Sequence, residues 1–129
     1  MSNLKSQNHS LNPKNELKFR RYRFSIDIIN ASKDFPKERT FDIIAKQLLR
    51  SSTSIGANIV EVKSSSSRRD FIKFYEIALK SANETKYWLG LLRDGLNFDG
   101  EKINIFLAED DEISKMIAAS LITLKGKRL

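Results

Sequence analysis

The chain of 129 residues contains no cysteine, five glycines, two prolines and a single histidine, His9. Without cysteine there is no disulfide framework, no thiolate metal site and no cysteine nucleophile. So few glycines and prolines argue against an all-β sandwich or barrel, which needs a turn about every ten residues. Strictly apolar runs do not exceed four residues, as at Met116 to Ala119, so no membrane-spanning helix is expected. The first residues also lack the apolar stretch of a signal peptide, and we expect a cytoplasmic protein without a membrane partner.

These shortages also bear on catalysis. With one histidine, outside every helical pattern, the sequence lacks the ligands and bases of Ser-His-Asp, zinc and di-iron sites. The acidic run from Glu109 to Glu112 does not form a calcium loop, because consecutive helical side chains diverge by about 100° and the loop glycine is absent. We interpret this run as a solvated acidic segment. No Gly-Lys-Ser/Thr phosphate loop is present. The sequence therefore predicts no enzyme, no metal and no cofactor.

What the chain does have is helical patterning. Hydrophobic residues make up 40% and charged residues 30%, which suits one globular domain. We predict a disordered polar tail over 1–14 and a four-helix bundle over 15–129, with helices at about 15–34, 40–63, 68–96 and 101–125. Thr40 is the expected N-cap of the second helix, and Ser67 with Asp70 forms a capping pair for the third. The acidic run is a candidate site for a kink or an interruption in the last helix. Short connections predict an all-α, antiparallel up-down-up-down bundle.

Each predicted helix carries an apolar stripe with helical spacing. The expected inward residues are Leu17, Phe24, Ile28, Ala31 and Phe35; Phe41, Ile44, Leu48, Ile55, Ile59 and Val62; Phe71, Phe74, Tyr75, Ala78, Ala82, Leu89, Leu92 and Leu96; and Ile103, Phe106, Leu107, Ile117, Leu121 and Leu124.

The first helix carries a second apolar stripe on nearly its opposite side: Phe19, Tyr22, Ile26 and Ile29. A helix at the edge of a monomeric bundle needs only one such stripe. The second stripe therefore predicts an oligomer interface. Two alternatives are that this helix is central in the fold or that the tail covers it.

The net charge is +7, and residues 1–40 contribute +5 of it. Such an excess attracts polyanions, so the basic residues of the first helix and of the corner between helices two and three are candidate nucleic-acid contacts. They are Lys18, Arg20, Arg21, Arg23, Lys63, Arg68 and Arg69. The alternative is a solvated basic surface. The interleaved Phe19 and Tyr22 share a helix stripe and are expected to pack rather than to stack on bases.

Three polar residues lie near the predicted apolar stripes, namely Asn58, Glu61 and Glu84, and their candidate partners are Arg50, Ser51, Ser54 and Arg93. A carboxylate near a core must be paired or hydrogen-bonded. We interpret the set as a structural polar network that fixes helix register, and place an acid–base pair of Glu61 and Glu84 second.

Several motifs together resemble a known family. They are Phe35-Pro-Lys-Glu38, Gln47-Leu-Leu-Arg-Ser-Ser52, Ser54-Ile-Gly-Ala-Asn-Ile59 with Glu61, Asp70-Phe71, Ala78-Leu79, Ser81-Ala-Asn-Glu84, Trp88-Leu89 and Leu92-Arg-Asp94. Over about residues 17–125 the chain is similar to the four helix bundle proteins also called 23S ribosomal RNA intervening-sequence proteins. The accessory protein of diversity-generating retroelements belongs to the same broad group. Val62 departs from the glycine usual after Glu61, and the last helix matches weakly.

The resemblance implies a non-catalytic four-helix bundle that assembles into a homopentameric ring. For the retroelement relatives it implies binding of nucleic acid and of a reverse transcriptase. Together with the charge, it makes RNA or DNA the expected partner besides the chain itself. The alternative is a protein-interaction scaffold, or an accessory subunit for a reverse transcriptase, with no direct nucleic-acid role.

Overall fold

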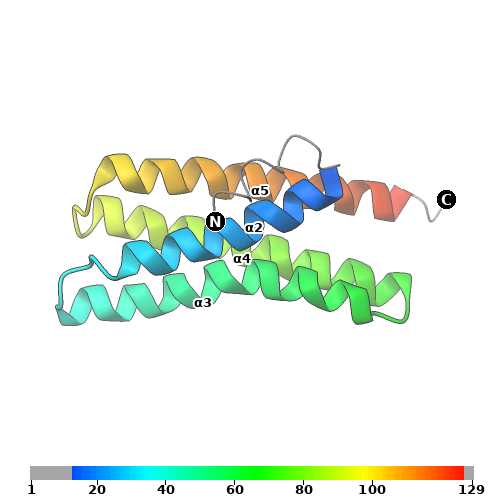
Figure 1. Cartoon of the computed structure of the whole chain (residues 1–129), viewed down its shortest axis with the longest axis horizontal. Coiled ribbons are helices and arrows are strands. Elements are labelled where there is room, and N and C mark those ends of the chain that lie inside the picture. The colour runs from blue at the N-terminus through cyan, green and yellow to red at the C-terminus, as the bar shows by residue number, and fades with distance from the viewer. Residues whose placement is uncertain (1–12, 127–129) are drawn as a thin grey trace.

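The computed structural model describes residues 13–126, which form four long helices and one short one (Figure 1). They are α2 (Pro13–Ser32), α3 (Arg39–Glu61), the 3-10 turn η2 (Val62–Ser64), α4 (Arg68–Asp94) and α5 (Gly100–Gly126). The predicted tail over 1–14 lies outside the described residues except for Pro13 and Lys14, which begin α2. Proline suits that first helical position because its φ is already helical.

The four helices run alternately up and down the long axis of the molecule, as the colours of Figure 1 show. The packing of α4 against α3 and α5 is the most extensive, and α2 lies across α3 and α5. This arrangement confirms the predicted all-α four-helix fold. The connection between α3 and α4, on the right in Figure 1, lies at the end of the bundle nearer to the start of α2.

Local signals explain most helix boundaries. α2 ends before Phe35-Pro36, since the residue before a proline avoids the α region. The Ser67 side chain accepts a hydrogen bond from the Asp70 amide at 3.2 Å, which confirms the predicted cap of α4. The expectation for Thr40 is wrong: Thr40 already lies inside α3, whose N-cap is Glu38, with an extended backbone and no side-chain capping bond.

The expected interruption of α5 is also wrong, because the helix continues through the acidic run. Glu109 pairs with Arg20 of α2 and Asp111 pairs with Lys86 of α4, at 2.7 Å in each case. These ion pairs offset the repulsion between neighbouring carboxylates.

α5 begins after a turn in which Asn97 and Asp99 have positive φ, and the Asp99 side chain accepts a hydrogen bond from the Lys102 amide at 3.2 Å.

The core follows the predicted stripes, with most of their members buried. Those that are only half-buried are Phe35, Ile44, Phe71, Phe74, Leu96, Leu107 and Leu124. The stripes missed Ile72 and Ile113, which are buried. They also missed Arg21 and Asp110, two charged side chains in the interior.

Candidate nucleic-acid interface

Arg20 and Arg23, two of the candidate phosphate contacts on α2, are already paired with carboxylates. Arg20 donates two hydrogen bonds to Glu109, from Nε at 2.9 Å and from NH2 at 2.7 Å. This hydrogen bonding raises the pKa of Arg20 above its usual value. Arg23 forms an ion pair with Asp27, one turn along the helix, at 3.3 Å. A phosphate would have to compete with these carboxylates, so Arg20 and Arg23 are weak candidates for binding it.

Arg21 points into the bundle and is 7% exposed. Its NH1 donates a hydrogen bond to the Gly56 carbonyl of α3 at 3.1 Å, while its buried Nε has no hydrogen-bond partner among the described residues. Burial lowers the pKa of Arg21 from its usual value. The sequence pattern assigned Arg21 to the surface, whereas the crossing of α2 over α3 places it inside.

Lys18 lies one turn before Arg21 on α2, and Lys63 lies in η2 at the end of α3. The structure brings these lysines together although they are 45 positions apart in the sequence. The pKa of Lys63 is lowered, first by the positive charge and close contact of Lys18 and to a lesser extent by Arg21. Both lysines are exposed, so this group of charges is open to a ligand.

Arg68 and Arg69 begin α4, just beyond η2, and both are exposed. Neither takes part in an ion pair within residues 13–126, and the same holds for Lys18 and Lys63. We call Lys18, Lys63, Arg68 and Arg69 the cationic end. These four candidates thus leave their positive charge open to a ligand, unlike Arg20 and Arg23.

The predicted polar network divides into separate parts. Arg50 of α3 pairs with Glu84 of α4, which also accepts a hydrogen bond from the Trp88 indole at 3.0 Å. Asn58 instead donates to the carbonyl and hydroxyl oxygens of Ser54, at 2.9 and 3.0 Å. Glu61 is exposed. The contacts of Glu84 tie α3 to α4, whereas Glu61 lies outside both groups.

Further polar side chains lie in the interior of the bundle. Thr85 of α4 donates a hydrogen bond to the hydroxyl of Ser51 of α3 at 2.9 Å, and both residues are fully buried. Asp110 of α5 is also fully buried, and neither of its carboxylate oxygens has a hydrogen-bond partner among the described residues. Burial raises the pKa of Asp110 to about 7. The interpretation of the acidic run as solvated is therefore wrong at this residue.

The second apolar stripe of α2 remains partly uncovered in the single chain. Tyr22 is 63% exposed and Ile29 is 43% exposed, while Phe19 and Ile26 are half-buried. α2 is therefore not a central helix. The stripe forms an apolar outer face of the bundle.

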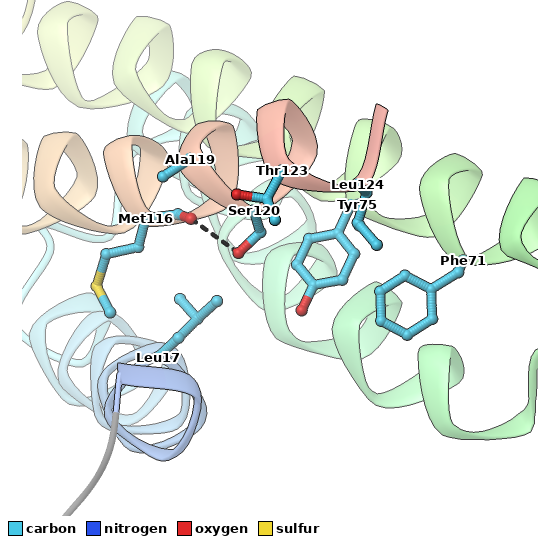
Figure 2. A pocket seen from close by; sticks show the side chains of 8 residues that line it. All are labelled: Leu17, Phe71, Tyr75, Met116, Ala119, Ser120, Thr123 and Leu124. Atoms are coloured by element: carbon cyan, nitrogen blue, oxygen red, sulfur yellow. Dashed lines mark hydrogen bonds between the residues drawn. The ribbon is translucent and has the colours of Figure 1, made fainter. Parts of the chain in front are cut away.

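An apolar pocket lies between α2, α4 and α5 (Figure 2). Leu17, Phe71, Tyr75 and Met116 line it, and the dashed line marks the 3.1 Å hydrogen bond from the Ser120 hydroxyl to the Met116 carbonyl. The phenol of Tyr75 is the only titratable side chain in this lining, so the pocket does not pair an acid with a base.

Residues 13–126 contain no cluster of three metal-ligating side chains, and no helix among them is long and apolar enough to cross a membrane.

The fold places the chain among the antiparallel four-helix bundle proteins. The model of the 23S rRNA-intervening sequence protein family matches residues 14–119, so the chain belongs to that family. The crystal structure of a protein of unknown function from the S23 ribosomal protein family of Bacteroides thetaiotaomicron is similar, with a TM-score of 0.76 and 39% identity. The match covers 81% of this chain and 97% of the other. No curated protein matches the chain.

Proposed function

We propose that this protein is a non-catalytic, homo-oligomeric bundle of the 23S rRNA-intervening sequence type that binds nucleic acid, with RNA as the preferred partner. The observation that carries the proposal is the cationic end, where exposed basic side chains gather without carboxylate partners in the described part of the chain. A phosphate backbone neutralises such charges and releases its counterions.

The apolar outer face of α2 supports self-association. Tyr22 and Ile29 expose large apolar side chains, and burying such groups between copies removes them from water. A closed ring, which the family resemblance implies is a pentamer, would repeat the cationic end around one axis. Several copies would then contact one RNA strand, and the strand would bind more tightly than to a single copy.

The test is fluorescence anisotropy with a labelled single-stranded RNA over a series of salt concentrations. We expect the logarithm of the binding constant to fall linearly with the logarithm of salt concentration. The variant Arg68→Gln/Arg69→Gln is expected to weaken binding and flatten this slope. Arg20→Gln/Arg23→Gln removes the same charge but is expected to change the slope less, because those arginines are already paired.

Absence of salt-dependent binding by the wild-type protein would refute the proposed function. Equal effects of the two arginine pairs would refute the assignment of the cationic end. The RNA is expected to remain at full length after incubation, as judged by denaturing gel electrophoresis. Its cleavage in proportion to added protein would refute the non-catalytic assignment.

A further inference from the structure

Three cationic side chains from two segments converge beside the start of α2. Lys18 and Arg21 are three positions apart and therefore lie on one face of α2. Gly56 and Lys63 are seven positions apart, about two turns, and α3 packs against α2. The hydrogen bond from Arg21 to Gly56 fixes how the two helices align. Because α3 runs antiparallel to α2, Lys63, seven positions after Gly56, lies toward the same end of the bundle as Lys18.

The structure supplies little to neutralise these charges. Ammonium groups only donate hydrogen bonds, so Lys18 and Lys63 cannot satisfy each other. None of the three side chains forms an ion pair in the described part of the chain. The preceding segment, residues 1–12, contains no aspartate or glutamate. By contrast, Arg20 and Arg23, on the same turns of α2, both have carboxylate partners.

Arg21 is the buried member of this group, with 7% of its surface exposed, whereas both lysines are exposed. A guanidinium carries five N–H donors, but within residues 13–126 the side chain makes a single hydrogen bond. The Arg21 side chain packs over Gly56, since a Cβ atom added to Gly56 would lie 3.4 Å from NH1 of Arg21. Arg21 is thus a fixed positive charge, while the exposed lysines can adjust to a ligand.

Like charges held together favour an anion that contacts them all. A tetrahedral oxyanion offers several acceptor oxygens, and charge-assisted hydrogen bonds to arginine and lysine are the strong kind. We infer that Lys18, Arg21 and Lys63 form a binding site for a single phosphate group of an RNA backbone. This inference rests on the proposed function and names the phosphate-binding residues within it.

The first test uses inorganic phosphate alone and does not depend on RNA. The melting temperature of the full chain is measured in phosphate and in chloride at matched ionic strength. For the wild type we expect phosphate to raise it by about 4 °C at a concentration tenfold above its Kd. The variant Lys18→Gln/Lys63→Gln is expected to lose this rise.

Lys73→Gln/Lys80→Gln is the matched control, because both lysines are exposed on α4 and outside the ion pairs of the described residues. It removes the same charge, so it also reports the general stabilising effect of phosphate as a salt. The Lys18→Gln/Lys63→Gln variant relieves repulsion between like charges, so in chloride it is expected to melt no lower than the wild type. An equal phosphate effect in all three proteins would overturn the site.

The second test counts phosphates with the RNA assay. For single strands the salt slope is about 0.7 for each neutralised phosphate. If Lys18 and Lys63 share one phosphate, the double variant loses about 0.7 from the slope and binds roughly tenfold more weakly at low salt. Two separate phosphates would cost about 1.4 from the slope.

The two tests separate the possible failures. RNA binding that the double variant retains with its full slope would overturn the site and leave the proposed function standing. A decrease of the salt slope by about 1.4 would overturn the inference that the two lysines share a single phosphate. A phosphate effect specific to Lys18 and Lys63, without any RNA binding by the wild type, would overturn RNA as the source of the phosphate.

Discussion

Asp110 gives the sharpest test of the structure, because a carboxylate without a hydrogen-bond partner among the described residues has been placed in the middle of the bundle. Its usual pKa is 3.8, and burial raises the pKa to about 7 in the folded protein. Of the nearby charges, Lys86 lowers this pKa and Asp111 raises it, and both effects are smaller than that of burial. Between these two pKa values the folded chain therefore holds one proton more than the unfolded chain.

Stability must then fall as the pH rises from about 4 to 7 and level off above, because ionising Asp110 costs more in the folded state. A shift of about 3 pKa units corresponds to a loss of about 4 kcal/mol in the free energy of unfolding. Asp110→Asn removes the ionisation. We expect the variant to match the wild type near pH 4 and to exceed its stability by up to about 4 kcal/mol at pH 8.

The assay is urea unfolding of both proteins between pH 4 and 8, at one protein concentration so that self-association cancels. Taking the difference between variant and wild type removes the pH dependence that the two proteins share. Glu112→Gln is the matched control, since Glu112 is exposed on the same helix. A difference that does not change with pH, or that favours the wild type at pH 8, would show that Asp110 ionises without cost and would refute the reasoning.

The remaining predictions concern packing, capping and assembly. Leu89→Ala removes a fully buried leucine of α4 and should lower the free energy of unfolding by about 2–5 kcal/mol; a loss below about 1 kcal/mol would mean that the core is not packed as described. Ser67→Ala removes the cap of α4 and should lower it by about 1 kcal/mol, whereas the exposed Ser66→Ala should change it little. Tyr22→Glu/Ile29→Glu places charges on the apolar outer face. Light scattering should give multiples of 14.8 kDa for the wild type, near 74 kDa for a pentamer, and the monomer mass for the variant. A wild-type mass of one chain would refute the interface.

Asp110 was expected to be solvated, although the pattern of the sequence around it is typical of a buried position. Asp110 lies seven positions after Ile103 and seven before Ile117, so it occupies the inward stripe of α5. The spacing alone therefore placed it in the core. The run of four acidic residues outweighed this position, because charged residues are seldom buried without a partner.

Arg21 and Lys63 are a different case. No spacing within α2 could show that Arg21 would lie against Gly56, because that contact depends on where α2 crosses α3. The approach of Lys18 to Lys63 depends on the same crossing. Hence the sequence identified the candidate basic residues as a group, but it could not separate those held by carboxylates from those left open.

The sequence by itself determined the number of helices, most of their boundaries and the inward stripes, because helical periodicity, capping residues and proline act over a few neighbouring residues. Its motifs also indicated the family. Only the tertiary structure decided which charges are neutralised, which are buried and which converge. Pairs such as Arg20 with Glu109 and Lys18 with Lys63 lie far apart along the chain. Their meeting depends on the alignment of whole helices, which is set by the packing of the entire core.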